Sequence, residues 1–171
     1  MAFHIDILEK RWIYMVGILV VGMWGVQLYF AAVEKYHPPS NVEVIDSAQL
    51  HLASGVGGDE FSEQNIGVKR DENGKLVVTM VAARYGFYPQ EIEIPQGEVF
   101  TMRIASFDVL HGIYIPLTNL NLMLVPGYIS EVTTALNNLG DYPMMCHDFC
   151  GMGHAYMFGN VKIVPKDEFE L

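Results

Sequence analysis

Apolar positions follow one another without a break near the start of this chain. In the 22-residue run from Trp12 to Val33, Gln27 is the one polar side chain apart from the tyrosine hydroxyls. A helix of that length is about 33 Å long, close to the ~30 Å hydrocarbon core of a bilayer. Aromatic residues, Trp12 and Tyr29 among them, lie toward its ends, as they do at membrane interfaces. The run predicts a transmembrane helix, with residues 1–37 as an N-terminal membrane anchor.

Two other interpretations of the run are less well supported. The apolar region of a signal peptide is usually about 7–15 residues, shorter than this one, although Phe30–Val33 resembles a cleavage site. A buried core helix would show a polar face, and this run has none. Lys10 and Arg11 precede the run, while Lys35 follows it. This weak positive-inside bias places the N-terminus in the cytoplasm and the rest of the chain on the outer, periplasmic or extracellular side of the cell membrane.

The pattern changes after the apolar run. Pro38-Pro39 cannot continue the helix and is expected to end it. Residues 38–75 are polar and acidic, with several glycines. This composition predicts a linker or surface segment, in which Val42–Leu52 favours a short helix.

Short β-like runs, separated by Pro and Gly, begin at residue 76, and the alternation is clearest in Glu91-Ile-Glu-Ile94. The predicted strands are Leu76–Ala83, Glu91–Ile94, Val99–Ser106, Gly112–Ile115, Asn121–Leu124, Ser130–Ala135, Asp141–Met145 and Asn160–Val164. Many short strands without a long helix between them indicate an antiparallel sandwich or barrel. We therefore expect a mainly β domain over residues 76–171.

The net charge of −10 lies entirely after the membrane anchor, because Asp6 and Glu9 balance Lys10 and Arg11 before the apolar run. An acidic domain argues against nucleic acid as a partner, since nucleic-acid binding needs a basic surface. It favours a cationic protein partner through electrostatic steering. The alternative is that the excess of acid only keeps the domain soluble.

The candidate chemistry is concentrated in one short segment. Cys146, Cys150, His154 and Met157 fall within twelve residues, and His111 lies 35 residues before the first cysteine. Thiolate and thioether are soft ligands that select copper, and electron-transfer copper sites combine them with imidazole. Without Cys146 the set would describe a mononuclear blue-copper site, whereas a second thiolate is enough to bridge two copper ions. A disulfide between the two cysteines is the alternative without a metal.

The spacing Cys-x3-Cys-x3-His-x2-Met, with Asp108-Val-Leu-His111 upstream, resembles the binuclear copper A centre of cytochrome c oxidase subunit II. Further segments in the family's order are Pro95-Gln-Gly97, Ser106–His111, Val125-Pro-Gly127, Gly140-Asp-Tyr142 and Met157-Phe-Gly159. The chain is most similar to the short, single-helix subunits of B-type haem–copper oxidases. The resemblance implies that residues 76–171 form a Greek-key cupredoxin β-barrel that holds copper A.

The resemblance also implies a role for each residue of the site. The expected metal ligands are His111, Cys146, Asp148, Cys150, His154 and Met157. The cysteines would bridge both coppers, each histidine would bind one copper, and the methionine would be a weak axial ligand. Residue 148 would contribute its backbone carbonyl, so the aspartate found here in place of the family's glutamate or glutamine leaves that role intact.

Several neighbouring residues are candidates for supporting roles. Asp108, three residues before His111, could orient that imidazole, or could only shape the end of a strand. Met144, Met145 and Met152 are expected to pack around the site rather than to bind metal.

An aromatic cluster before Pro89 is a candidate for electron input, because the family carries aromatic residues, often tryptophan, in this region. Here Tyr85 or Phe87 would take that place, with core packing as the equal alternative.

We therefore expect subunit II of a terminal haem–copper oxidase, with no catalytic residue in this chain. Copper A would accept electrons from cytochrome c, or a similar donor, outside the membrane. It would relay them to haem in a separate catalytic subunit I for oxygen reduction to water with proton pumping. The alternatives are the electron-input subunit of a copper A nitric oxide reductase and a membrane-anchored mononuclear blue-copper carrier.

Overall fold

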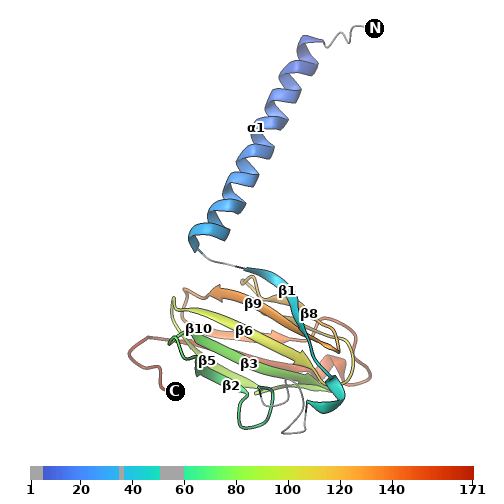
Figure 1. The fold of residues 1–171 in the computed structure, drawn as a ribbon, viewed down its shortest axis with the longest axis vertical. Helices are drawn as coiled ribbons and strands as arrows, with labels where there is room; N and C mark the ends of the chain where they lie inside the picture. Colours follow the sequence, from blue (N-terminus) through green and yellow to red (C-terminus); the bar gives the residue numbers. More distant parts are fainter. Residues whose placement is uncertain (1–5, 35–36, 51–59) are drawn as a thin grey trace. The chain divides into compact units, whose positions relative to one another are not determined.

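A computed structural model describes residues 6–34, 37–50 and 60–171. It divides the chain into two compact units, residues 1–36 and 37–171 (Figure 1). The first unit is helical and the second consists of two β-sheets. The chain is therefore mainly β with a single N-terminal apolar helix, as the sequence predicted.

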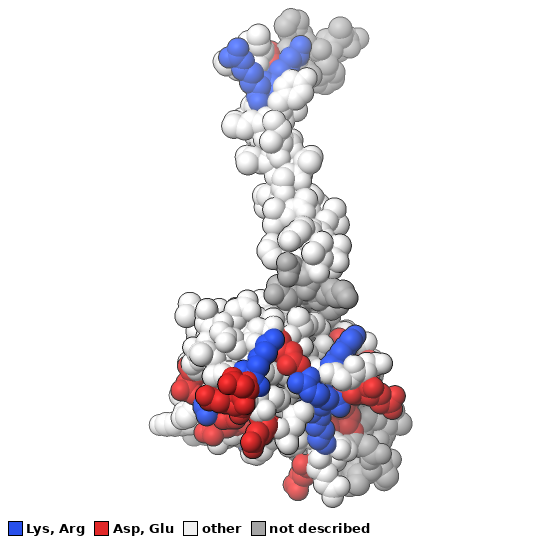
Figure 2. Space-filling view, turned by 90° about the vertical axis from the view of Figure 1, so that its left-hand side faces the viewer, with Lys and Arg blue, Asp and Glu red and all other residues white. Residues whose placement is uncertain are grey.

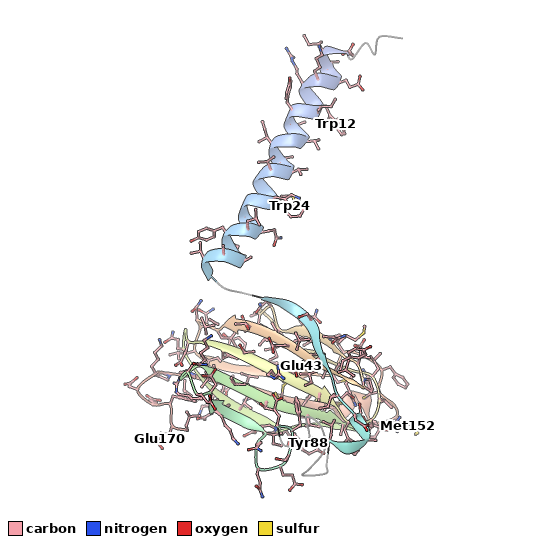
Figure 3. All side chains as sticks on the ribbon, viewed as in Figure 1. Trp12, Trp24, Glu43, Tyr88, Met152 and Glu170 are labelled. Atoms are coloured by element: carbon pink, nitrogen blue, oxygen red, sulfur yellow. The ribbon has the colours of Figure 1, made fainter. Side chains whose placement is uncertain are left out.

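The apolar run forms helix α1, Ile7–Tyr29, which continues as a π-helical turn, η1, over Phe30–Glu34. Asp6 caps the N-terminus, where its carboxylate accepts a hydrogen bond from the Leu8 N–H at 2.7 Å. No residue of α1 is buried, and apolar side chains stand out all round the helix, Trp12 and Trp24 among them (Figure 3). Charged side chains occur only near its N-terminal end (Figure 2). By length and composition, Ile7–Val33 can cross a membrane, as a single-pass protein requires.

The strands of the second unit form two sheets. The first sheet has the order β1 (His37–Val44), β9 (Tyr128–Ala135), β6 (Val99–Ser106), β3 (Leu76–Ala83), β2 (Gly67–Arg70), and β4 (Gly86–Tyr88) also pairs with β3. The second sheet has the order β5 (Glu91–Pro95), β11 (Phe158–Val164), β10 (Gly140–Met145), β7 (His111–Tyr114), β8 (Asn121–Leu124). All eight predicted strands are present, with bounds that differ by at most two residues at either end.

The pairing corrects one expectation, because the domain is not purely antiparallel. β3 and β6 pair in parallel, and so do β5 and β11. Parallel neighbours need a long crossover, and here the chain leaves β3, forms β4 beside it in the same sheet, passes through β5 of the opposite sheet, and then returns as β6. Connections that cross between two sheets are typical of a Greek-key sandwich.

Alternate residues of each strand build the core between the sheets. In β3 the side chains of Leu76, Val78, Met80 and Ala82 are all fully buried. β6 contributes Phe100, Met102 and Ile104, and the opposite sheet contributes residues of β5, β7, β10 and β11. Burying one large apolar side chain of this kind stabilises the fold by about 1.5–3 kcal/mol. Cys146, Cys150 and Met157 pack in the same core, so the core also stabilises the part of the domain that carries the site.

The structure also places strands in the segment that the sequence assigned to a linker. β1 pairs with β9 and β2 pairs with β3. The short helix expected over Val42–Leu52 is wrong for the described part of that range, because β1 runs to Val44 and only a 3₁₀ turn follows, at Ser47–Gln49; residues 51–52 lie outside the described residues. Both strands lie at sheet edges, where a polar composition is normal. Their sequences therefore lack a clear alternation of apolar and polar residues that would predict a strand.

Arg103 on β6 holds part of that segment to the first sheet. Its guanidinium pairs with Glu60 and Glu131 at 2.6 Å each and with Glu43 on β1 at 3.3 Å. We refer to these four residues as the Arg103 cluster. Hydrogen bonding to Glu60 is the main cause that raises the pKa of Arg103 above its usual value. The cluster therefore joins β1, β6, β9 and the segment before β2 through one permanently charged side chain.

Candidate metal centre

The segment from Cys146 to Met157, which we call the ligand loop, connects β10 to β11. The Cys146 N–H donates to the Met157 carbonyl at 3.1 Å and so closes the loop at its base. Within it, the Met157 N–H donates to the His154 carbonyl and the His154 N–H to the Gly151 carbonyl. Gly151 has a φ of +127°, a conformation that glycine adopts without the penalty of a side chain. The loop is thus a hydrogen-bonded unit rather than a loose connection.

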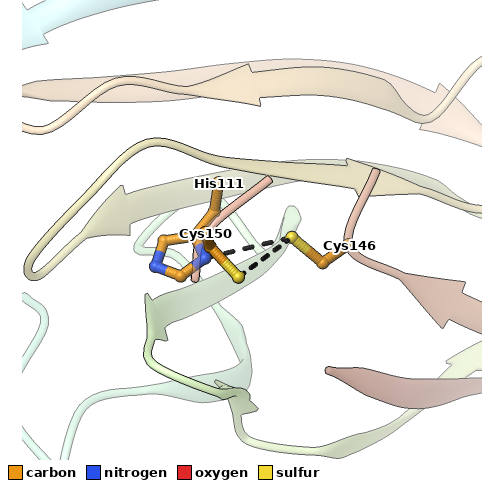
Figure 4. A group of neighbouring side chains, drawn as sticks. All are labelled: His111, Cys146 and Cys150. Carbon is orange, nitrogen blue, oxygen red and sulfur yellow. Dashed lines mark hydrogen bonds between the residues drawn. The ribbon is translucent and has the colours of Figure 1, made fainter. Parts of the chain in front are cut away.

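Three side chains with atoms that can bind a metal meet here, two from the ligand loop and one from β7 (Figure 4). His111 is the first residue of β7, and β7 pairs with β10, which leads directly into Cys146. The His111 Nδ1 lies 3.9 Å from the Cys146 Sγ, and the two Sγ atoms of Cys146 and Cys150 lie 3.9 Å apart. These ligand atoms all fall within 4.8 Å of one another, and all three residues are buried. They form the group that could hold a metal ion.

The remaining expected ligands surround this group. The Cys150 Sγ lies 3.7 Å from both the Nδ1 of His154 and the Sδ of Met157. The backbone carbonyl of Asp148 lies 3.2 Å from the Cys146 Sγ. The structure therefore brings all six residues of the predicted ligand set to one place, the cysteines and Met157 through sulfur, Asp148 through its backbone carbonyl, and each histidine through Nδ1.

The two cysteines are free thiols rather than a disulfide. Burial, and then the neighbouring Cys146, raise the pKa of Cys150 to about 11. The Cys150 thiol is therefore protonated at neutral pH, and a bound cation would be needed to stabilise it as a thiolate. Two thiols, two imidazoles, a thioether and a carbonyl are a donor set that fits copper.

Asp108 determines which nitrogen of His111 faces the thiols. Its Oδ1 lies 2.8 Å from the His111 Nε2. Although burial raises the pKa of Asp108, hydrogen bonds from His111 and from the backbone N–H groups of Arg84 and Val109 lower it overall. An ionised carboxylate only accepts hydrogen bonds, so Nε2 carries a proton and Nδ1 is the ring nitrogen that faces the Cys146 Sγ. The carboxylate contacts both the imidazole of His111 and the backbone N–H groups of Arg84 and Val109, so its geometry fits both of the roles considered for Asp108.

The two aromatic candidates lie in different environments. Tyr85 is 40% exposed, and its side chain fills the space beside the ligand loop: its hydroxyl would lie 2.8 Å from a Cβ added at Gly151, and its ring 2.4 Å from a Cβ added at Gly153. Phe87 is only 1% exposed and belongs to the core. The core-packing alternative therefore describes Phe87, and Tyr85 is the candidate that touches the site.

Of the three methionines expected to pack around the site, one does not. Met144 is fully buried in the core and Met145 is partly buried, but Met152 is 97% exposed and points away from the domain (Figure 3). Phe149 and Tyr156 of the ligand loop are also well exposed. The packing expectation was wrong for Met152 because the loop turns this side chain outward between two glycines.

Arg84 is a neighbour of the site that belongs to none of the sequence motifs described above. Its Nε donates a hydrogen bond to the Cys150 carbonyl at 3.2 Å, across a separation of 66 residues. Only the fold brings this side chain, which follows β3, to the ligand loop.

Fold and site together describe a cupredoxin-like domain in a chain with one helix that can cross a membrane, and the domain has a group of soft ligand atoms that could hold a metal ion. The sequence model of the family described as "Cytochrome C oxidase subunit II, periplasmic domain" matches residues 73–164, which is more than half of the chain. This chain belongs to the cytochrome c oxidase subunit II family.

Curated relatives carry the same description. Cytochrome c oxidase subunit 2 of Thermus thermophilus is 37% identical over 89 residues, which cover 52% of this chain and 66% of the relative. Cytochrome c oxidase subunit 2 of Thermostichus vulcanus is 24% identical over 191 residues, covering 95% of this chain and 58% of the relative. The chain spans less than two thirds of the length of these relatives.

Two solved structures resemble the chain. A chain from a cryo-EM structure of a heme-copper terminal oxidase dimer superposes with a TM-score of 0.66 and 26% identity, covering 92% of this chain and 99% of that chain. The periplasmic domain of subunit II of cytochrome oxidase from Bradyrhizobium japonicum superposes with a TM-score of 0.50 and 18% identity, over 54% of this chain and 86% of that one. The second likeness supports the cupredoxin-like fold alone.

Proposed function

We propose that this chain is the electron-input subunit of a haem–copper oxidase, with a binuclear copper A centre under the ligand loop. The observation that carries the proposal is the convergence of two free thiols, two imidazole Nδ1 atoms and a thioether at 3.7–3.9 Å from one another along the chain of contacts. A mononuclear site would need only one of the two thiols. Membership of the subunit II family agrees with the proposal.

The positions of the donors suggest how the ligands would divide between two metals. Cys146 and Cys150 would bridge, since each thiol is next to the other and to a different histidine. His111 would then bind one copper and His154 the other. When bound, the centre supplies one-electron transfer with the charge shared over two metals. The closed loop and the buried strand hold the donors in place, which limits how much they move when the charge changes.

Two further residues complete the proposed ligand set. Met157, buried next to the Cys150 Sγ, would supply the weak axial thioether. Asp148 would bind through its backbone carbonyl, which already lies beside the Cys146 Sγ. Asp108 would hold the His111 ring in the tautomer that leaves Nδ1 free.

Tyr85 is the proposed point of electron input. Its ring lies against Gly151 and Gly153, which are the residues next to the ligands Cys150 and His154 in the chain. A half-exposed aromatic ring in contact with both neighbours gives a donor a short packed path to the centre. In the same ligand loop, Phe149, Met152 and Tyr156 expose apolar surface.

We infer that the donor is cytochrome c or a comparable protein outside the membrane, and that the acceptor is haem in a catalytic subunit I. Oxygen reduction to water and proton pumping would belong to that partner, and helix α1 would anchor the chain in lipid with its N-terminus in the cytoplasm. The likeness to a chain of a heme-copper terminal oxidase dimer supports a partner of this kind.

The test uses the full-length chain, purified in detergent and loaded with copper. We expect two copper ions per chain, an electron paramagnetic resonance spectrum with splitting shared by two equivalent coppers, and reduction by ferrocytochrome c. One copper per chain with a mononuclear spectrum would instead identify a blue-copper carrier. Co-purification with the catalytic subunit, followed by oxygen and nitric oxide consumption assays, distinguishes the two terminal acceptors.

The role of Tyr85 has its own test in the same preparation. Tyr85→Leu should slow reduction by ferrocytochrome c severalfold at unchanged copper content, whereas Tyr85→Phe, which keeps the ring, should not. Tyr88 is the matched control, because it is a half-exposed tyrosine of the neighbouring strand β4. An equal loss of rate in Tyr88→Leu would place electron input elsewhere.

A further inference from the structure

Arg84 contacts the ligand loop at a ligand residue. Its side chain leaves the end of β3 and donates a hydrogen bond from Nε to the carbonyl of Cys150 at 3.2 Å. The side chain is 48% exposed, so it lies at the boundary between the buried donors and solvent.

Arg84 also contacts the group that orients the opposite ligand. Its backbone N–H donates to Asp108 Oδ2 at 3.0 Å, and its Nε lies 4.0 Å from the same oxygen. The other carboxylate oxygen of Asp108 binds the His111 Nε2. Cys150, Arg84, Asp108 and His111 therefore form one continuous chain of contacts that spans the site from the ligand loop to β7.

We propose that Arg84 is a positioning residue of the metal centre, which links the ligand loop to the Asp108–His111 pair and raises the reduction potential of the centre through its charge. This inference rests on the proposed function, since it concerns a bound redox metal. It assigns a task to a side chain that the ligand motif does not include.

The direction of the effect follows from electrostatics. Reduction adds one negative charge to a site that already contains two thiolates and lies near the Asp108 carboxylate. The Arg84 cation lies against the backbone carbonyl of Cys150, a residue that would bind the metal through its sulfur. A cation in this place stabilises the reduced form, because opposite charges attract most strongly where solvent is scarce. The ligand loop contains one carboxylate, that of Asp148, and no lysine or arginine, so Arg84 supplies a cationic group that the loop itself lacks.

Partial exposure makes the effect sensitive to salt. Screening weakens interactions between charges that water can reach, with a Debye length of about 10 Å at 0.1 M ionic strength. The contribution of the Arg84 charge should therefore shrink as ionic strength rises, whereas that of its hydrogen bond to the Cys150 carbonyl should not.

The experiment measures the reduction potential of the copper-loaded, full-length chain in detergent by a spectroelectrochemical titration at low and high salt. We expect Arg84→Met and Arg84→Gln to lower the potential, and Arg84→Lys, which keeps the charge, to remain closer to the wild type. The difference between Arg84→Gln and the wild type should decrease at high salt. Arg70→Met is the matched control, because Arg70 is also a partly exposed arginine but pairs with Glu98.

Copper content and spectrum separate the possible outcomes. Unchanged potentials in Arg84→Gln and Arg84→Met, with full copper content, would overturn the role of Arg84 and leave the proposed function intact. An equal shift in Arg70→Met would also overturn it, since the effect would then be general to the domain. If Arg84→Met does not fold, the Lys and Gln pair still decides between charge and packing. A wild-type chain that binds no copper would overturn both this inference and the proposed function.

Discussion

The Arg103 cluster and the site formed by the ligand loop with His111 both bring together side chains from distant parts of the sequence. They differ in how closely the polar groups of those side chains are paired within the protein. In the Arg103 cluster, one guanidinium that is only 16% exposed pairs with three carboxylates, all within 3.3 Å. Under the ligand loop, two thiols, two imidazoles and a thioether are joined by successive contacts of 3.7–3.9 Å, at the limit of weak sulfur contacts.

This difference separates a structural cluster from a functional one. The charged groups of the Arg103 cluster have their partners within the protein, so the cluster can stabilise the fold without a ligand. A thiol is a weak hydrogen-bond donor and tolerates an apolar environment, so Cys146 and Cys150 can be buried without strong partners. Their lone pairs then remain available to a metal. Changes in one region should therefore affect stability, and changes in the other should affect metal binding.

Cys146→Ser should have the largest effect, and the effect should be confined to the site. It removes one of two thiolates, so we expect loss of the spectrum shared by two coppers and loss of about one copper per chain. The free energy of unfolding of the metal-free chain should fall by only about 1 kcal/mol, since a serine hydroxyl can donate to the Asp148 carbonyl that lies beside the thiol. Copper analysis and denaturant unfolding measure the two quantities. A two-copper spectrum that persists in this variant would contradict the bridging role.

Arg103→Met should give the reverse result. Three carboxylates would be left together without their common cation, so we expect the free energy of unfolding to fall by about 2 kcal/mol. Copper content and the spectrum of the folded chain should not change. Arg103→Lys, which keeps the charge but not the planar guanidinium, should lose less. Unfolding in denaturant measures the effect, and loss of copper from the folded variant would show that the two regions depend on each other.

Gly153→Ala tests the packing of Tyr85 on the ligand loop. An added Cβ would lie 2.4 Å from the tyrosine ring, so the ring or the loop must move. We expect a loss of about 1–2 kcal/mol in stability, typical of an overpacked site, together with slower reduction by ferrocytochrome c. Gly86→Ala is the control, because the Cβ there would make only ordinary contacts, at 3.4 Å or more. Equal losses in the two variants would mean that the Tyr85 contact has no special role.

Much of the domain could be predicted from the sequence, because Pro and Gly separate apolar runs and thus mark the strand ends. β3, β6 and β8 have the predicted bounds without change. β1, β2 and β4 were not predicted because they are short or polar edge strands, whose stability comes from pairing with neighbours rather than from their own pattern.

The site also contains residues that could be predicted from the sequence and one that could not. The ligand motif is local, so the spacing of Cys146, Cys150, His154 and Met157 was enough to propose that they meet. Asp108 could be proposed as a partner of His111 because it lies three positions before that histidine in the sequence. The contact between Arg84 and the Cys150 carbonyl could not, because it joins residues 66 positions apart and depends on the direction of one side chain.

Glu98→Gln should have the smallest effect, since it breaks one isolated pair instead of a cluster. A hydrogen bond from Arg70 is the main cause that lowers the pKa of Glu98 from its ordinary value of 4.5. Because the pKa is lower in the folded state, the pair stabilises the fold fully above the unfolded pKa, and this contribution is lost as the pH falls through the folded pKa. At pH 7 we expect Glu98→Gln to cost a few tenths of a kcal/mol, as partly exposed pairs do, and the difference from the wild type to vanish in acid once the pH has fallen below the lowered pKa of Glu98. Unfolding at several pH values measures it, and a difference of 2 kcal/mol, equal to that of Arg103→Met, would remove the distinction between a cluster of charges and a single pair.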